Sequence, residues 1–369
     1  MSLRRRHALA EPAARAALRL AACEAQIALL DRLRPQNLAF EKARLVRALE
    51  GGERPEPRFD YAAPPELGQL RRELDATAQA LDVSVTEERL LAARAQELSL
   101  DAQLVEHVGS TELLALAGRR FPPPEAHDEL SRLARQLVTT VPDASEVQPP
   151  GLHFTDDSRD PHSLWSELSR LIAAERWPVR VEVVSGLASL AAVAEGVVRV
   201  RAGAKLSARD ARRIALHEVE GHVRPRLAGA VLGGVLKAGS ARADEDEEGR
   251  AILLEERAGL LDAARRRELG RRYLAAASVR EGAPFWDTVQ LLGQLGATLA
   301  QAVELSCRVH RGGGLGRELI YLVGYRRVAA RLAAEPVLER VMKHGRVSLD
   351  AAHDLLLDSI ELDDDGDVI

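Results

Sequence analysis

One short stretch of the chain, H-E-V-E-G-H at residues 217–222, carries side chains that could bind a catalytic metal. Two neutral imidazoles are typical zinc ligands, and a carboxylate beside the first of them could act as the acid and base of a hydrolytic reaction. Zinc lowers the pKa of its water towards about 7, so a base at Glu218 could take that proton as the oxygen attacks a carbonyl. The stretch therefore predicts a zinc site with His217 and His222 as ligands and Glu218 as the general base.

The spacing of the two histidines places a requirement on their helix. In the better-known zinc-protease motif the histidines lie four residues apart on one helix face, whereas His217 and His222 lie five apart. At about 100° per residue, five steps give a separation of roughly 140° on a regular helix. Both rings reach one metal only if the helix is distorted. Gly221 and Pro225 favour a distortion, because glycine tolerates unusual backbone angles and proline cannot continue a regular helix.

The residues before the motif predict a buried helix that follows a small sheet. Residues 207–210, S-A-R-D, resemble a capping box, and an apolar stripe continues from Ala211 to Val219. Upstream, alternating valines at residues 179–183 and a second run at 197–200 are typical of strands. The edge of such a sheet could bind an extended peptide as an additional strand. Taken alone, the histidines could equally be polar residues near a helix end that hydrogen-bond to loops.

A third metal ligand is expected on a downstream helix. The acidic run at residues 244–248 lies at a predicted helix start, where it would complement the helix dipole and face water. Glu256 differs, because Ile252, Leu253 and Leu260 lie one turn away from it. A carboxylate on so apolar a stripe needs a partner. That partner is either the metal, which makes Glu256 the third ligand, or an arginine such as Arg250.

Composition and charge exclude several classes of protein. The chain has 369 residues, 46% hydrophobic and only 3% aromatic, which indicates a globular, mainly helical protein with an aliphatic core. The net charge is −5 with no basic tract, so nucleic acid is not an expected partner. The two cysteines form no recognisable metal or disulfide pattern. Without a signal peptide or an apolar run of about 18 residues, we expect a cytoplasmic protein that does not span a membrane.

The chain divides at a proline-containing stretch near residue 142. We predict an N-terminal helical region at residues 1–140 and a catalytic region at residues 141–369, which together could form one continuous domain. After the H-E-x-x-x-H motif the pattern is helical to the acidic tail at residues 361–367, which we expect to be solvated.

Several motifs resemble one family of proteins. The stretch E-E-R-A-G-L at residues 255–260 is similar to the Gln/Glu-Glu-Gly-Leu-Ala motif of the QEGLA-motif (flavohemoglobin expression-modulating) proteins, and places the motif glutamate on Glu256. These proteins share a domain with the microtubule-associated tyrosine carboxypeptidases. The family's R-x-x-R-G-G and acid-x-x-Tyr-Leu-x-Gly stretches resemble residues 308–313 and 318–324. Residues 33–37 and 57–61 resemble its opening, so the likeness covers most of the chain.

The resemblance implies a mainly helical α+β fold, a zincin-like metallopeptidase with a small sheet next to the active-site helix. Position by position, it implies that His217, His222 and Glu256 hold zinc and that Glu218 is the base. Animal members remove a C-terminal tyrosine or phenylalanine, so a peptide or protein C-terminus is the expected substrate. The predicted function is therefore a zinc-dependent carboxypeptidase that releases a C-terminal aromatic residue. The alternatives are a non-catalytic zinc-binding regulatory or interaction protein, or another metalloenzyme.

A carboxypeptidase must also bind the terminal carboxylate of its substrate. The bidentate guanidinium of arginine suits this task, and Arg308 and Arg311 lie in the family-like stretch before a Gly-Gly turn. Tyr321 could donate a hydrogen bond to the oxyanion. The alternatives are that both arginines end a surface helix and that Tyr321 is a core residue. His310 belongs to the same stretch and could approach the site.

Overall fold

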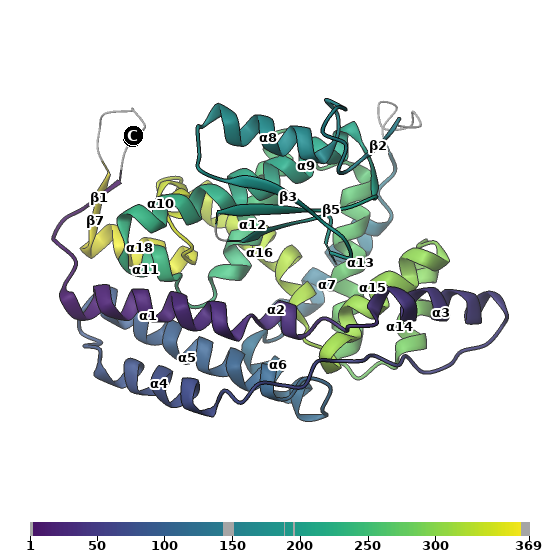
Figure 1. Cartoon of the computed structure of the whole chain (residues 1–369), viewed down its shortest axis with the longest axis horizontal. Coiled ribbons are helices and arrows are strands. Elements are labelled where there is room, and N and C mark those ends of the chain that lie inside the picture. The colour runs from purple at the N-terminus through teal and green to yellow at the C-terminus, as the bar shows by residue number, and fades with distance from the viewer. Residues whose placement is uncertain (1–2, 143–150, 188, 195, 363–369) are drawn as a thin grey trace.

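The computed structural model describes residues 3–142, 151–187, 189–194 and 196–362. This part of the chain is mainly helical with small sheets, as the sequence predicts, and the helices surround one short sheet (Figure 1). Most of the predicted loop after residue 142 and the acidic tail after residue 362 lie outside the described residues. None of the described helices is long and apolar enough to cross a membrane.

In the N-terminal region the first, fourth and fifth helices pack side by side, whereas the third and seventh pack on helices at residues 299–310 and 263–280. One face of the first helix, α1, buries residues at intervals of three and four, from Ala13 through Leu20 to Ile27, against α5 and α11. The bounds are α1 (Glu11–Ile27), α2 (Leu29–Arg32), α3 (Leu38–Glu50), α4 (Gly68–Ala80), α5 (Thr86–Glu106), α6 (Glu112–Arg120) and α7 (His127–Val138).

The predicted strands form a three-stranded sheet. Its order is β3 (Arg180–Val184), β5 (Val197–Arg201), β4 (Ala191–Ala194), with β3 parallel and β4 antiparallel to the central strand β5. Strands β3 and β5 confirm the two valine runs. The buried valines of β5 pack against α8 (Leu164–Ala174) and α9 (Ala208–Leu216). Two further pairs are antiparallel: β2 (Leu152–Phe154) with β6 (Lys205–Ser207), and β1 (Leu3–Arg5) with β7 (Ile360–Leu362).

The remaining helices build the other side of the molecule. Their bounds are α10 (Arg224–Leu232), α11 (Gly234–Ala238), α12 (Ala243–Arg257), α13 (Ala263–Arg280), α14 (Phe285–Gln294), α15 (Leu299–His310), α16 (Ile320–Ala334), α17 (Leu338–Lys343) and α18 (Leu349–Asp358). Helices α12 and α16 cross in close backbone contact. A Cβ at Gly249 would lie 2.2 Å from the carbonyl carbon of Gly324, and one at Gly324 would lie 2.0 Å from the Glu245 oxygen. Only glycine fits at either position, so this crossing fixes α16 beside the acidic start of α12.

A buried ionic joint ties the N-terminal helices to α12. Arg346 contacts Glu24 of α1 at 2.7 Å and Glu247 of α12 at 3.7 Å. Arg120 of α6 contacts Asp101 of α5 at 2.7 Å and Asp244 of α12 at 3.1 Å. A hydrophobic cluster with members from Leu3 to Ile360 accompanies this joint. Residues 1–140 and 141–369 therefore share both a core and a charge network.

Candidate metal centre

The helix that carries both histidines contains a π turn. Helix α9 begins with the Ser207 side chain accepting from the Asp210 N–H, as the predicted cap requires. It continues into η1 (His217–Val223), a π-helical turn in which the Arg224 N–H donates to the Val219 carbonyl five residues back. Such turns are rare and occur often at functional sites. The ring centroids of His217 and His222 lie 5.1 Å apart, so the predicted distortion is confirmed.

Gly221 and Pro225 contribute to this turn differently from the prediction. The chain continues through Pro225 into α10 without ending the helix. Gly221 keeps a helical backbone, and its φ is not positive. A Cβ there would lie 2.7 Å from the Ala251 Cβ. Glycine is thus required because η1 approaches α12 so closely, which brings the histidine turn against the acidic helix.

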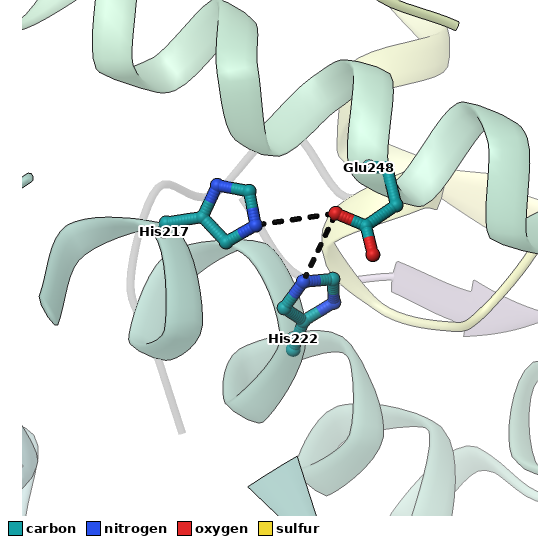
Figure 2. A group of neighbouring side chains, drawn as sticks. All are labelled: His217, His222 and Glu248. Carbon is teal, nitrogen blue, oxygen red and sulfur yellow. Dashed lines mark hydrogen bonds and ion pairs between the residues drawn. The ribbon is translucent and has the colours of Figure 1, made fainter. Parts of the chain in front are cut away.

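The carboxylate that completes the group is Glu248 on α12. Its Oε2 lies 3.2 Å from His217 Nε2 and 3.9 Å from His222 Nε2, and Figure 2 shows both rings directed at this oxygen. One ligand atom from each of the three residues lies within 4.8 Å of the others. Two imidazole nitrogens and one carboxylate oxygen are donors that zinc takes in many proteins, so the group could hold a metal ion.

The structure does not bring Glu256 to the histidines, and this corrects the predicted third ligand. Glu256 is exposed and accepts a hydrogen bond of 2.6 Å from the Tyr325 hydroxyl. Glu248 and Glu255 are seven residues apart, about two turns, and share the face of α12 that contacts His217. One further residue turns Glu256 about 100° away from that face. The sequence suggested a metal or an arginine as the partner of Glu256. Its partner is instead the Tyr325 hydroxyl at the surface.

The acidic run at residues 244–248 is also not the solvated surface that its sequence predicts. Asp246 is fully buried, and Glu247 and Glu248 are each 7% exposed. The motif signal for Glu248 was present in the sequence. Residues 247–251, E-E-G-R-A, match the Gln/Glu-Glu-Gly-Leu-Ala motif with glycine directly after the glutamate, which residues 255–260 do not. Gly249 is the motif glycine and is required by the contact with α16.

Buried carboxylates orient both imidazoles from behind. His217 Nδ1 lies 2.7 Å from Glu255 Oε1, and His222 Nδ1 lies 2.9 Å from Glu247 Oε1. Glu255 is fully buried and also accepts a hydrogen bond of 3.0 Å from Arg265 Nε. A metal-binding histidine commonly donates its second ring N–H to a carboxylate in this way. The arrangement leaves each Nε2 free to face Glu248 and a cation.

The charges around His217 suit a cation. Burial alone would lower the pKa of His217, but its hydrogen bonds with Glu248 and Glu255 outweigh that effect and raise the pKa to about 9. Burial would raise the pKa of Glu255, yet the Arg265 guanidinium and His217 bring it down to about 2. The pocket therefore holds a proton on His217 between two carboxylates. A divalent metal would replace that proton, since metal binding requires a neutral imidazole.

Glu218, the predicted base, makes no hydrogen bond or ion pair through its carboxylate with any residue in the described ranges. It is half-buried and directly follows His217 in η1. By contrast, Glu220 in the same turn is paired with Arg224 at 2.7 Å. The Glu218 carboxylate is thus available to a water molecule.

A cluster of arginines around Tyr321 adjoins the Glu248 carboxylate. Arg317 donates to Glu248 Oε1 at 3.0 Å and to the Tyr321 hydroxyl at 2.8 Å. Arg308 contacts Glu318 at 2.6 Å and the same hydroxyl at 3.5 Å. The structure thereby brings the predicted residues Arg308 and Tyr321 to the side of the metal group. Arg317, which connects them to it, was missed, because no spacing rule relates residue 317 to a glutamate on another helix.

Arg311 differs from Arg308 and Tyr321, the other two predicted substrate-binding residues, in its lack of a side-chain partner in the part of the chain that the structure describes. Within the described residues its side chain makes no hydrogen bond and no ion pair. Burial and the neighbouring Arg308 lower the pKa of Arg311 to about 10. Its turn is held by the N-terminal region, because the Gly312 N–H donates to the Tyr61 hydroxyl at 2.6 Å and the Gly312 carbonyl accepts from Gly109 N–H at 3.0 Å. A partly buried, unpaired guanidinium on an anchored turn is suited to bind an anion.

A model of one protein family matches most of the chain. The microtubule-associated tyrosine carboxypeptidase model matches residues 47–358, a range that includes every residue of the metal group and the arginine cluster. The chain belongs to this family. A search of curated proteins found no match. Membership of the tyrosine carboxypeptidase family implies a peptidase with a peptide or protein substrate, in agreement with the resemblance of the motifs.

His310, which the sequence suggested could approach the site, has other partners. Its Nε2 lies 2.9 Å from the Thr288 hydroxyl, and its ring packs against Phe285 of α14 with the two ring planes tilted by 60°. Burial lowers its pKa to about 4, below the ordinary value of 6.5. As the pH falls, His310 therefore takes up its proton in the unfolded chain at a higher pH than in the folded protein. The stability that neutral His310 contributes is complete above about pH 6.5 and is lost as the pH falls towards 4.

We therefore expect His310→Gln to reduce the acid sensitivity of folding. Between pH 7 and pH 5, the wild type should lose about 2 kcal/mol more unfolding free energy than the variant, from the two pKa values of His310. Glutamine keeps a hydrogen-bonding group for Thr288. Urea denaturation at both pH values measures the difference. Equal losses in the two proteins would contradict a neutral, buried His310.

Proposed function

We propose that this protein is a zinc-dependent carboxypeptidase that removes the last residue from a peptide or protein. The observation that carries the proposal is the group of His217, His222 and Glu248, in which both histidines are oriented by buried carboxylates. Its position in a member of the tyrosine carboxypeptidase family supports C-terminal cleavage, and the family name supports tyrosine as the residue released.

The donor set fits zinc, and the remaining residues supply the proton chemistry. When bound there, zinc would polarise the scissile carbonyl and lower the pKa of a water molecule. Glu218 takes the proton from the attacking water and delivers it to the leaving amine, which a free carboxylate next to His217 can do. The Tyr321 hydroxyl, held by Arg317, is a donor for the oxyanion that develops on the carbonyl.

Strand β4 is a suitable binding edge for the peptide main chain. It pairs only with β5 in the described sheet, so its second edge has no strand partner there. It also contacts η1, the turn that carries the histidines. A substrate that adds as a strand to β4 would lie next to η1.

The C-terminal carboxylate of the substrate would bind Arg311. Hydrogen bonds to charged groups contribute about 1.5–3 kcal/mol, so Arg311→Met should raise KM by about 10- to 100-fold with a smaller change in kcat. The exposed Arg326→Met on α16 is the matched control and should leave KM unchanged. Steady-state kinetics on a peptide ending in tyrosine measure both variants. An equal effect of the two substitutions on KM would contradict this role.

The function is tested by metal content and product analysis together. Elemental analysis of the purified protein, after reconstitution, should give one zinc per chain. Mass spectrometry should show loss of one residue from a peptide with a free C-terminal tyrosine and none from its C-terminal amide. Zinc without release from any free C-terminus would favour the non-catalytic zinc protein. No zinc at all would refute the metal centre.

A further inference from the structure

Arg250 is a buried arginine with an unusual set of partners. It lies two residues after Glu248 on α12 and is 1% exposed. No carboxylate in the described part of the chain lies at ion-pair distance from it. Its Nη2 instead donates to the Glu220 carbonyl at 2.6 Å and to the Gly221 carbonyl at 3.4 Å, both in η1. Burial of a charged group is costly, so this contact with a backbone calls for a physical reason.

The π turn creates a carbonyl that its own helix cannot satisfy. In an α-helix, the Glu220 carbonyl would accept from the Arg224 N–H, but in η1 that N–H donates to Val219. The next donor along the chain would be residue 225, which is a proline and has no N–H. The Glu220 carbonyl is therefore left without a backbone donor by the same distortion that aligns the histidines. An unpaired carbonyl away from water is destabilising.

We propose that Arg250 is a positioning residue that stabilises the π turn by supplying this missing donor. It thereby keeps His217 and His222 on one face, opposite the Glu248 carboxylate of its own helix. The contact of Gly221 with Ala251 lies at the same joint. Position 250 is leucine in the family motif and arginine in this chain. The inference rests on the proposed metal centre, which Arg250 supports without touching the metal or the substrate.

The test uses cobalt(II) as the probe and a backbone rescue. Arg250→Leu should weaken Co²⁺ binding by about 10- to 100-fold, as much as the loss of a direct partner of a metal ligand does, and should alter the visible spectrum of the bound ion. Pro225→Ala restores an N–H one turn after Glu220. Combined with Arg250→Leu, it should recover most of the lost affinity and the wild-type spectrum, whereas a general packing defect would not be repaired by a backbone donor.

The outcomes separate this inference from the proposed function. If the wild type bound no cobalt, the metal centre itself would be refuted, and this inference with it. If the wild type and Arg250→Leu bound cobalt equally tightly, the inference alone would be overturned. A loss in Arg250→Leu that Pro225→Ala does not relieve would overturn it as well. Should Arg250→Leu not fold by circular dichroism, recovery of folding in the double variant supports the inference, and its absence refutes it.

Discussion

Glu248→Gln is expected to abolish tight zinc binding, whereas Glu256→Gln leaves it unchanged. The first substitution removes the carboxylate that faces both Nε2 atoms, and the second alters an exposed side chain bound to Tyr325. Loss of a direct ligand should weaken zinc affinity by more than about 100-fold, the upper range for partners one layer further out. Competition against a chelator measures both affinities.

The pair of variants discriminates between two assignments of the third ligand. Both glutamates lie on α12, and both substitutions remove one negative charge while keeping the shape of the side chain. A general electrostatic effect would therefore appear in both. Loss of zinc in Glu256→Gln with retention in Glu248→Gln would reverse our assignment.

Glu218→Gln should retain one zinc per chain and lose turnover. A general base typically contributes 10²- to 10⁴-fold, so we expect kcat to fall by about that factor. The amide has the shape of the carboxylate but cannot accept the proton from the attacking water. Zinc analysis and single-turnover release of the C-terminal residue should be measured on the same sample.

Glu220→Gln is the matched control for this prediction. Glu220 lies in the same π turn, but its carboxylate is already paired with Arg224. Its replacement should leave both zinc content and kcat near the wild-type values. If Glu218→Gln were as active as Glu220→Gln, another residue would have to serve as the base.

The sequence predicts those parts of the site that follow from local geometry. His217, His222 and the need for a distorted helix result from residue types and a five-residue spacing, and the π turn provides the distortion. The β-branched alternation before the motif correctly gave two strands of the sheet. These features depend on neighbouring residues, whose relation a single sequence displays directly.

Local rules of helix burial could not place Glu248, because its burial is a tertiary effect, although the family motif at residues 247–251 contains it. Five consecutive acidic residues at a helix start normally remain in water, and their charge would oppose burial. Here arginines distant in sequence neutralise them: Asp244 meets Arg120, Glu247 meets Arg346, and Glu248 meets Arg317. Burial logic therefore selected Glu256, which follows the buried Ile252 and Leu253 by one turn but is itself exposed, one residue before the end of α12.

The ionic joint around Arg346 also has a consequence for the order in which the protein becomes functional during synthesis. The histidines and Glu248 leave the ribosome about 100 residues before Arg346, which takes roughly 5–20 s at usual elongation rates. Until then Glu247, which orients His222, lacks the cation that links it to Glu24 of the first helix. The nascent chain thus carries all three candidate metal ligands before it can hold them in place. Assembly of the candidate metal centre is in this way coupled to synthesis of the segment that contains Arg346.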